Sequence, residues 1–236
     1  MKTALTEMAG GLNAPFMRQK ILEFGKLNLE AYKAFITQED WFERASIEVQ
    51  KIVGTKHPSY IGMTWLEFLQ KGRRMKLNHQ LFDQTPEYYL TEEMKWPKMS
   101  FIEVDGQFYV DDDGNHRSCI AKFYFEKLGR KQLHGVEVRR YKVKWNALKA
   151  YSRLSKRLES MGKVVVKLNR ELIRREDGPG WKEDYFRSVL SLTNRCSGQC
   201  MEFSLDDCIW LNNQIETASW MIRRFPRDPV DRLLLK

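Results

Sequence analysis

Two short hydrophobic runs near the middle of the chain have the character of β-strands. Residues 99–104 and 107–110 are rich in β-branched and aromatic side chains, which favour strands. Asp105-Gly106 separates the two runs, and this dipeptide is a frequent two-residue turn of antiparallel hairpins. The pattern therefore predicts a β-hairpin over residues 99–110.

After the hairpin the hydrophobic spacing becomes helical. Apolar residues recur at helical intervals over residues 118–128, and Gly129 follows as a C-cap. Residues 135–143 then form another strand-like run. The predicted unit is a hairpin, a glycine-containing turn, a helix and a strand.

The C-terminal part alternates between the same two patterns. An amphipathic helix is predicted over residues 146–161, ending at Gly162, and Ser204 has the position of an N-cap for a last helix to about Phe225. Between these helices we expect strands over residues 163–174, 181–193 and 201–203, joined by turns at residues 176–180 and 196–200.

The N-terminal third is predicted to be mostly helical. Residues 13–35 and 40–53 contain apolar positions that suit helices, whereas residues 1–11 are expected to be frayed. Thr64 and Glu67 have the spacing of a capping box at the start of a short helix. We find no catalytic motif in this third.

These elements predict an α+β fold in three parts. We expect a helical N-terminal region over residues 1–95, a mixed-sheet core over residues 96–145, and a C-terminal part over residues 146–236. The last part combines a basic helix, hairpin strands and a closing helix, which we expect to pack on the core.

Composition restricts the class of protein. The chain is 42% hydrophobic and 12% aromatic, which is unlike a disordered chain. It has neither a signal-peptide pattern nor an apolar run long enough to span a membrane, so we expect a cytoplasmic protein. The four cysteines do not suit a disulfide scaffold, and the spacing of Cys196, Cys200 and Cys208 favours buried free thiols over a zinc site.

The positive charge is concentrated in one segment. The formal net charge is +9, yet residues 122–175 alone contain seventeen Lys or Arg and only four acidic residues. Such a segment suits a polyanion or an acidic protein surface, and equally a solvated, solubilising surface.

The turn between the predicted strand and helix has the composition of an anion site. Gly114 permits close approach to the first amides of the helix, which have no intrahelical acceptor and lie at the positive end of its dipole. The side chains of Arg117 and His116 can donate hydrogen bonds to a phosphate. Phosphate is a common ligand at the N-terminus of a helix. Asp111, Asp112 and Asp113 would repel a bare phosphate, which predicts Mg²⁺ between them and the ligand. An ordinary solvated loop with an N-cap is the alternative.

The residues from Gly106 to Ala121, which include Asp-Gly-Asn-His-Arg, together with the run from Gly135 to Arg139, resemble the core of the ParB/sulfiredoxin superfamily. The resemblance covers roughly residues 100–141. It implies nucleotide binding, with ATP as the expected ligand, at Gly114, Asn115, His116, Arg117 and Ser118.

Two departures narrow the resemblance. Asn115 stands where sulfiredoxins have their reactive cysteine, which argues against sulfinic acid reduction. A strand-rich segment replaces the helix-turn-helix domain of ParB partition proteins. The chain is most similar to the plasmid fertility-inhibition proteins of the Osa and FiwA type, a branch that implies ATPase or DNase activity and a block of DNA transfer through type IV secretion systems.

The resulting hypothesis is a nucleotide-dependent enzyme that acts on DNA. Asp111, Asp113, His116 and Arg117 would be catalytic, and Asp111, Asp112 and Asp113 would bind Mg²⁺. We expect the DNA backbone to contact Arg139, Arg140, Lys149, Arg153, Lys156 and Arg157.

Two further functions remain open at this point. The first is a non-enzymatic inhibitor that binds a type IV coupling ATPase or a relaxosome component, with a vestigial nucleotide site. The second is a metabolite kinase.

Overall fold

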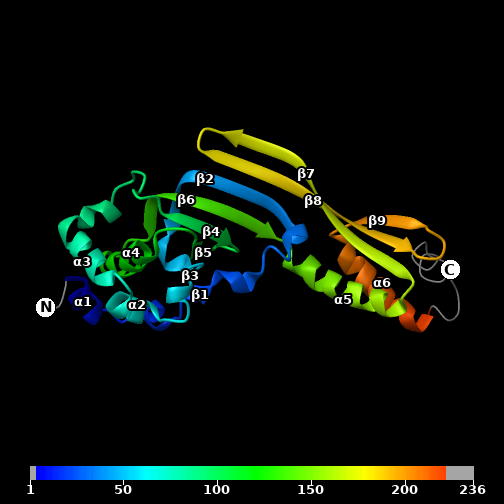
Figure 1. Cartoon of the computed structure of the whole chain (residues 1–236), viewed down its shortest axis with the longest axis horizontal. Helices are drawn as coiled ribbons and strands as arrows, with labels where there is room; N and C mark the ends of the chain where they lie inside the picture. Colours follow the sequence, from blue (N-terminus) through cyan, green and yellow to red (C-terminus); the bar gives the residue numbers. More distant parts are fainter. Residues whose placement is uncertain (1–3, 222–236) are drawn as a thin grey trace. The chain divides into compact units, whose positions relative to one another are not determined.

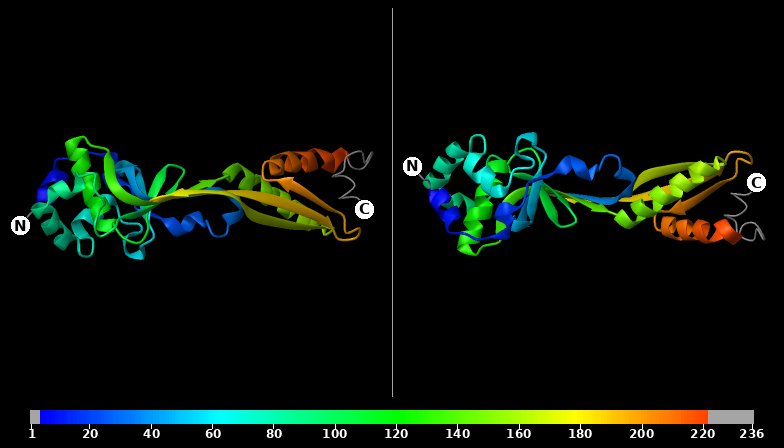
Figure 2. Two further views of the ribbon diagram at one scale, coloured as in Figure 1. Left: turned by 90° about the horizontal axis from the view of Figure 1, so that it is seen from above. Right: turned by 90° about the horizontal axis from the view of Figure 1, so that it is seen from below.

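The computed structural model describes residues 4–221 (Figures 1 and 2), and these fall into two compact units. Unit 1 contains residues 4–29, 39–141 and 177–183, and unit 2 contains residues 30–38, 142–176 and 184–221. Together they hold six α-helices and a mixed sheet. The predicted α+β class is therefore confirmed.

The sheet of unit 1 is built around the predicted hairpin. Strands β4 (Ser100–Val104) and β5 (Gln107–Val110) pair antiparallel. Asp105 and Gly106 have φ values of 52° and 74°, as a two-residue hairpin turn with positive φ at both positions requires. The hairpin prediction is confirmed.

Parallel strands flank the hairpin on both sides. Strand β6 (Gln132–Val143) pairs with β4, β3 (Ile52–Thr55) pairs with β5, and β1 (Leu22–Glu23) pairs with β3. Strand β2 (Ile36–Glu48) follows β6 in the strand order. Because β1, β3 and β5 are parallel, their carboxyl ends meet at one edge.

The helix predicted over residues 118–128 is present as α4 (Asn115–Leu128). It follows β5 directly and ends at Gly129, which has a φ of 66° and donates its amide to the Glu126 carbonyl. The face of α4 that includes Cys119, Phe123 and Phe125 is buried in the core of unit 1. Helices α1 (Ala4–Gly10), α2 (Trp65–Lys71) and α3 (Met75–Gln84) have contacts with α4.

Three N-terminal predictions are wrong. Residues 40–53 form most of β2 and the start of β3, and residues 13–35 form short 3₁₀ turns and β1. The apolar residues Ala45, Ile47 and Val49 follow one another at intervals of two, which is the period of a strand. The supposedly frayed start contains α1, whose Leu5 and Ala9 are buried.

The capping box was predicted correctly. Thr64 accepts from the Glu67 amide at 3.1 Å, and the Glu67 carboxylate accepts from the Thr64 amide at 2.8 Å.

The predicted division at residue 95 does not match the compact units. Strands β1 and β3, which were assigned to a helical region, pair within the same sheet as β4 and β5. Residues on both sides of position 95 belong to unit 1, which extends to residue 141 before the hairpin tip at 177–183.

Unit 2 follows its predicted order of elements. It contains α5 (Trp145–Met161), most of β7 (Val164–Gly178) and β8 (Trp181–Asn194), β9 (Cys200–Ser204) and α6 (Asp207–Met221). Strand β9 pairs antiparallel with β8. Leu154, Leu158, Leu190 and Leu211 are fully buried in its core, and the predicted helix end near Phe225 lies outside the described residues.

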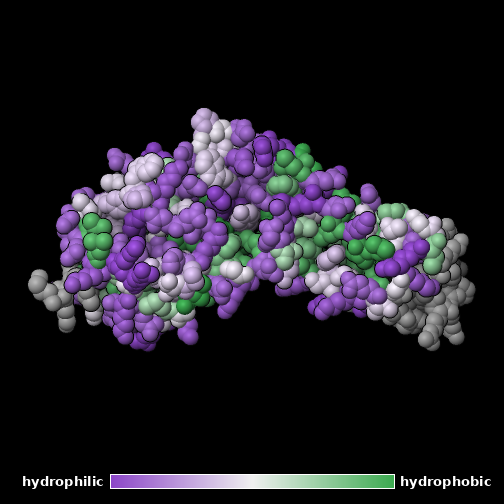
Figure 3. Space-filling model, viewed as in Figure 1, coloured by the Kyte–Doolittle hydropathy of each residue, from purple (hydrophilic) through white to green (hydrophobic). Residues whose placement is uncertain are grey.

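No helix within residues 4–221 is long and apolar enough to cross a membrane. The face shown in Figure 3 is mainly hydrophilic, with several separate hydrophobic patches.

A buried lysine fixes α4 to the sheet. Lys122 is 1% exposed, and its ammonium donates to the carbonyls of Val49, Gln50 and Ile52 at 3.2, 3.2 and 2.9 Å. Burial lowers the pKa of Lys122 to about 7. Three carbonyl acceptors match the three N–H groups of the protonated form. Lys122, which we counted in the basic segment, is therefore not part of its surface.

Replacement of Lys122 by Met keeps the volume of the side chain and removes all three donors. We expect the free energy of unfolding to fall by about 3 kcal/mol, because buried carbonyls lose their partners. Urea denaturation of both proteins measures the difference. The exposed Lys127 lies further along α4, and Lys127→Ala should change the value by less than about 0.5 kcal/mol. An equal effect of the two substitutions would show that the buried ammonium is not an anchor.

Candidate functional site

The candidate site lies where two parallel strands end. Strands β3 and β5 are neighbours, so residues 55–57 after β3 lie beside residues 111–117 after β5. The Lys56 amide donates to the Val110 carbonyl at 3.0 Å. Ligands of α/β sheets commonly bind at carboxyl ends of strands, where helix N-termini also gather.

Asp111 is buried and paired with cations. Its carboxylate is 3% exposed and accepts from the Lys56 ammonium at 2.5 Å, and Arg139 lies 4.0 Å away. The amide of Asp111 donates to the Ser100 carbonyl at 2.9 Å. The charge of Asp111 is therefore neutralised within unit 1.

The other two aspartates have separate surroundings. Asp113 accepts from the Gly114 amide at 2.6 Å and from Arg117 at 2.9 Å. Asp112 has an exposed side chain, and its amide donates to the Ser100 hydroxyl at 3.1 Å. The prediction that the three carboxylates converge on one Mg²⁺ ion does not agree with these separate surroundings. Within residues 4–221, no group of three or more His, Cys, Asp and Glu is placed to hold a metal ion.

Gly114 is required by the backbone. Its φ is 119°, and a Cβ at this position would meet Met99 side-chain atoms at 3.3 and 3.4 Å. The chain can therefore turn from β5 into α4 only with a glycine here. Because its amide is bonded to Asp113, Gly114 does not present the donor that we expected it to offer a ligand.

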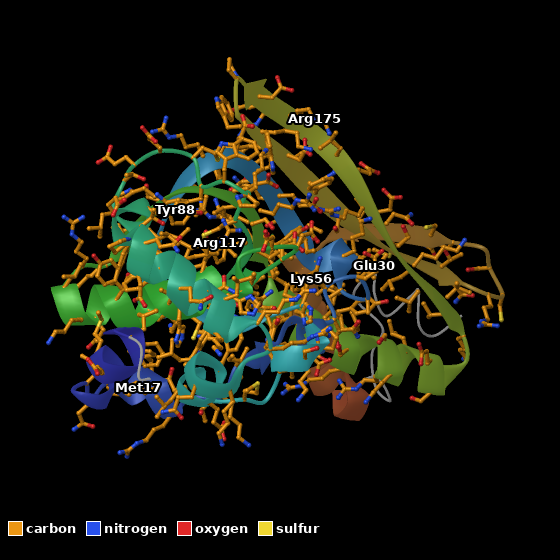
Figure 4. The ribbon with its side chains drawn as sticks, turned by 60° about the vertical axis from the view of Figure 1, so that its left-hand side comes forward. Met17, Glu30, Lys56, Tyr88, Arg117 and Arg175 are labelled. Atoms are coloured by element: carbon orange, nitrogen blue, oxygen red, sulfur yellow. The ribbon has the colours of Figure 1, made fainter. Side chains whose placement is uncertain are left out.

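Arg117 holds the segment before β4 instead of presenting its charge to a ligand. Its guanidinium donates to the Tyr88 hydroxyl at 2.7 Å, to the Lys98 carbonyl at 3.2 Å, to the Pro97 carbonyl and to Asp113. The side chain is 14% exposed. Figure 4 shows Arg117 and Tyr88 close together. The predicted phosphate-binding and catalytic role of Arg117 does not agree with this arrangement.

The three amides that follow Gly114 precede the first internal hydrogen bond of α4. Ser118 donates its amide to the Gly114 carbonyl at 2.7 Å, which is the first bond of the helix. The amides of Asn115, His116 and Arg117 have no acceptor among the described residues, as expected at a helix start. Asn115 is held in place because its side-chain oxygen accepts from the Thr55 hydroxyl at 2.6 Å. The Ser118 side chain is fully buried and does not reach a ligand from solvent.

His116 is the second residue of α4 and lies beside these amides. Its Nε2 is 2.6 Å from the Arg73 carbonyl and 3.4 Å from the Tyr60 hydroxyl. Burial lowers the pKa of His116, and the positive charges of Arg74 and His57 lower it further. The Arg73 carbonyl and Asp113 oppose this effect. His116 therefore gains a proton more readily when an anion is present.

Three basic residues that sequence analysis missed lie near the start of α4. Lys56 and His57 have exposed side chains after β3, and Arg74 is exposed before α3. The His57 amide donates to the Thr55 hydroxyl at 3.0 Å, and its ring stacks on Tyr60 at 4.6 Å. No local motif marks these residues, because only the pairing of β3 with β5 and the packing of α3 bring them to the turn.

The predicted nucleic-acid residues divide between the two units. In unit 1, Arg140 bonds Glu103 at 2.6 Å and lies 3.9 Å from Asp40. Arg139 is half exposed. In unit 2, Lys149, Arg153 and Lys156 are exposed along one face of α5, while Arg157 is partly buried.

A pocket of about 560 Å³ also lies within unit 1. Arg139, Trp41 and Trp181 line it together with the acidic residues Glu39 and Asp177. Both signs of charge are present, so the lining alone does not identify a class of ligand.

Comparisons with models of known protein families, with curated protein sequences and with solved structures found no match to this chain.

Removal of the Arg117 guanidinium should destabilise unit 1. We expect Arg117→Ala to lower the free energy of unfolding by about 3 kcal/mol, because two backbone carbonyls, Tyr88 and Asp113 lose a partner. Arg117→Lys should recover only part of this loss, since one ammonium cannot reach all four acceptors. Urea denaturation measures both changes. Wild-type stability of Arg117→Ala would contradict the structural role.

The free energy of unfolding should also fall in mild acid, because His116 takes up a proton more readily in the unfolded chain. The pKa of folded His116 lies below the ordinary value of 6.5. The unfolded chain therefore binds more protons as the pH falls below that value, and unfolding becomes easier. His116→Gln keeps a donor for the Arg73 carbonyl and removes the titration. Urea denaturation at pH 5.5 and 7.5 should show a smaller pH effect in this variant. Equal pH effects in both proteins would refute the shift.

Proposed function

We propose that the chain binds a phosphate group at the start of α4. The observation that carries the proposal is the set of three amides, Asn115 to Arg117, without acceptors in the described chain. A phosphate beside them would gain backbone hydrogen bonds and the favourable end of the helix dipole. Asp111 and Asp113 oppose the ligand weakly, because each is already paired with a cation.

The surrounding side chains supply the charge that Arg117 does not. His57 and Arg74 are exposed and lie close enough to depress the pKa of His116 electrostatically, whereas the exposed Lys56 already neutralises Asp111. A bound phosphate would reverse this effect and favour protonated His116. Affinity should therefore rise as the pH is lowered from 8 to 6.

The proposed ligand is a nucleotide, ATP in the first instance. The resemblance of residues 100–141 to the ParB/sulfiredoxin superfamily supports this choice, because the Gly114–Arg117 segment corresponds to its nucleotide-binding turn. We propose no hydrolytic step. Arg117 is engaged by four acceptors, and the aspartates that were expected to bind Mg²⁺ are dispersed.

For the biological role we propose fertility inhibition by binding without catalysis. A role in blocking conjugative transfer rests on the resemblance to Osa and FiwA. The coordination of Arg117 by Tyr88, Pro97, Lys98 and Asp113 favours the non-enzymatic form of this hypothesis over the ATPase or DNase form. The partner would then be a type IV coupling ATPase or a relaxosome component.

Ligand binding is tested by thermal shift with inorganic phosphate and with ATP, each with and without Mg²⁺. A ligand at a hundredfold excess over its Kd should stabilise the wild type by about 2.7 kcal/mol. The double variant His57→Asn/Arg74→Asn removes an imidazole and a guanidinium from the surroundings of His116. Asn at 57 retains a cap for the Ser59 amide, and Asn at 74 tolerates the φ of 63° at that position.

We expect the double variant to bind at least about tenfold more weakly, a loss of about 1.4 kcal/mol. Lys127→Ala, at the other end of α4, should bind like the wild type. If ATP and phosphate leave the wild type unchanged, or if Lys127→Ala weakens binding as much as the double variant, the proposed site is wrong. A conjugation assay of the same variants tests the biological role separately.

A further inference from the structure

Strand β7 has an edge that no described strand covers. It spans fifteen residues, Val164–Gly178, and it stands at the end of the strand order with β8 on its other side (Figure 1). Seven consecutive residues, 171–177, are exposed, among them Leu172 at 49% and Ile173 at 58%. Natural edge strands are usually short or interrupted by proline or a bulge, because an open edge pairs with other chains. Strand β7 has no proline.

The charges of β7 are complementary to the same strand running in the opposite direction. If Ile173 lies opposite Ile173 of a second copy, Glu171 lies opposite Arg175, and Arg170 lies opposite Glu176. The two-fold symmetry repeats each pair, so every charged residue of the segment 170–176 except Arg174 faces an opposite charge. Leu172 faces Arg174, whose aliphatic stem can pack on it. Opposite charges directly across a strand pair are stabilising.

Neighbouring registers lack this property. A slip of one residue in either direction places Arg170 opposite Arg175 or Glu171 opposite Glu176. Slips of two residues place Arg170 opposite Arg174, or Arg174 opposite itself. Like charges directly opposite one another are destabilising. The sequence of β7 therefore favours one antiparallel register with a second β7. Charged residues that only keep an edge strand from pairing would not need to be complementary to the same strand in another copy.

The internal ion pairs of β7 do not prevent this pairing. Glu171 bonds Arg187 at 3.0 Å and Arg174 bonds Glu176 at 3.2 Å, and all four side chains are 46–61% exposed. Arg175 bonds the buried Asp184 at 2.6 Å, but its own side chain is 50% exposed, and Arg170 donates to the Ile36 carbonyl at 3.0 Å. Exposed pairs of this kind contribute little and can be shared with a second partner.

We propose that β7 pairs with β7 of a second copy of this chain, antiparallel and centred on Ile173, to form a symmetric dimer. The isologous arrangement satisfies the open backbone edges of both copies at once. It also brings the exposed Leu172 and Ile173 of each copy against the partner strand. This inference is independent of phosphate binding, because no residue of β7 belongs to the site at α4.

Two experiments on the full-length protein test the dimer. In a Cys196→Ser/Cys200→Ser background, which removes the exposed thiols, Ile173→Cys should form a disulfide-linked dimer on mild oxidation. Leu77→Cys is the matched control, because Leu77 is 56% exposed on α3. We expect cross-linking of Ile173→Cys to exceed that of the control at least fivefold.

Sedimentation measures the pairing without cross-links. The wild type should sediment as a dimer at tens of micromolar, and Glu171→Arg/Glu176→Arg should sediment as a monomer, because four Arg–Glu pairs become Arg–Arg pairs. Glu159→Arg/Glu202→Arg makes the same change of net charge at exposed positions of α5 and β9 and should remain dimeric. A monomeric wild type, a dimer that survives Glu171→Arg/Glu176→Arg, or equal cross-linking of the two cysteine variants would each overturn the proposal.

Discussion

The attachment of α4 to the sheet is the interaction on which the rest of unit 1 depends. The Lys122 ammonium donates to two carbonyls of the segment between β2 and β3 and to the first carbonyl of β3. Its charge lies near the rings of Phe16 and Trp65, at 5.2 and 4.9 Å. One side chain thus joins a helix, a strand connection and the N-terminal segment. Burial of a lysine is costly unless every donor is satisfied, so this position allows little variation.

A second cation fixes where α4 begins. Arg117 ties the first turn to Tyr88 and to the chain before β4, and it neutralises the Asp113 carboxylate that caps Gly114. The helix start is therefore rigid and has unbonded amides while its own arginine is already engaged. Rigid, preorganised donors favour binding because little further ordering is needed. The same engagement explains why we propose a binding site and no catalytic step.

The sequence predicted those elements whose conformation is determined by residues close together in the chain. The Asp105-Gly106 hairpin, α4 with its Gly129 cap, and α5 were predicted because their turns and periodicity lie within short stretches. Strand β2 was missed because Trp41 and Phe42 obscured a period of two. In the site, the Gly114 turn was visible in the sequence. The approach of Tyr88, Pro97 and Lys98 to Arg117 was not, and neither was the approach of His57 and Arg74 to His116. These contacts join residues that are 19 to 59 positions apart along the chain.

The central claim is that the first amides of α4 hold a phosphate, and amide chemical shifts in an ¹⁵N-labelled sample test it most directly. During titration with inorganic phosphate at constant ionic strength, the amide signals of Asn115, His116 and Arg117 should move together along one saturating curve. The signal of Gly114, whose amide is bonded to Asp113, should move less. Unchanged signals at these three residues, or small shifts spread evenly over the exposed lysines and arginines, would contradict the account.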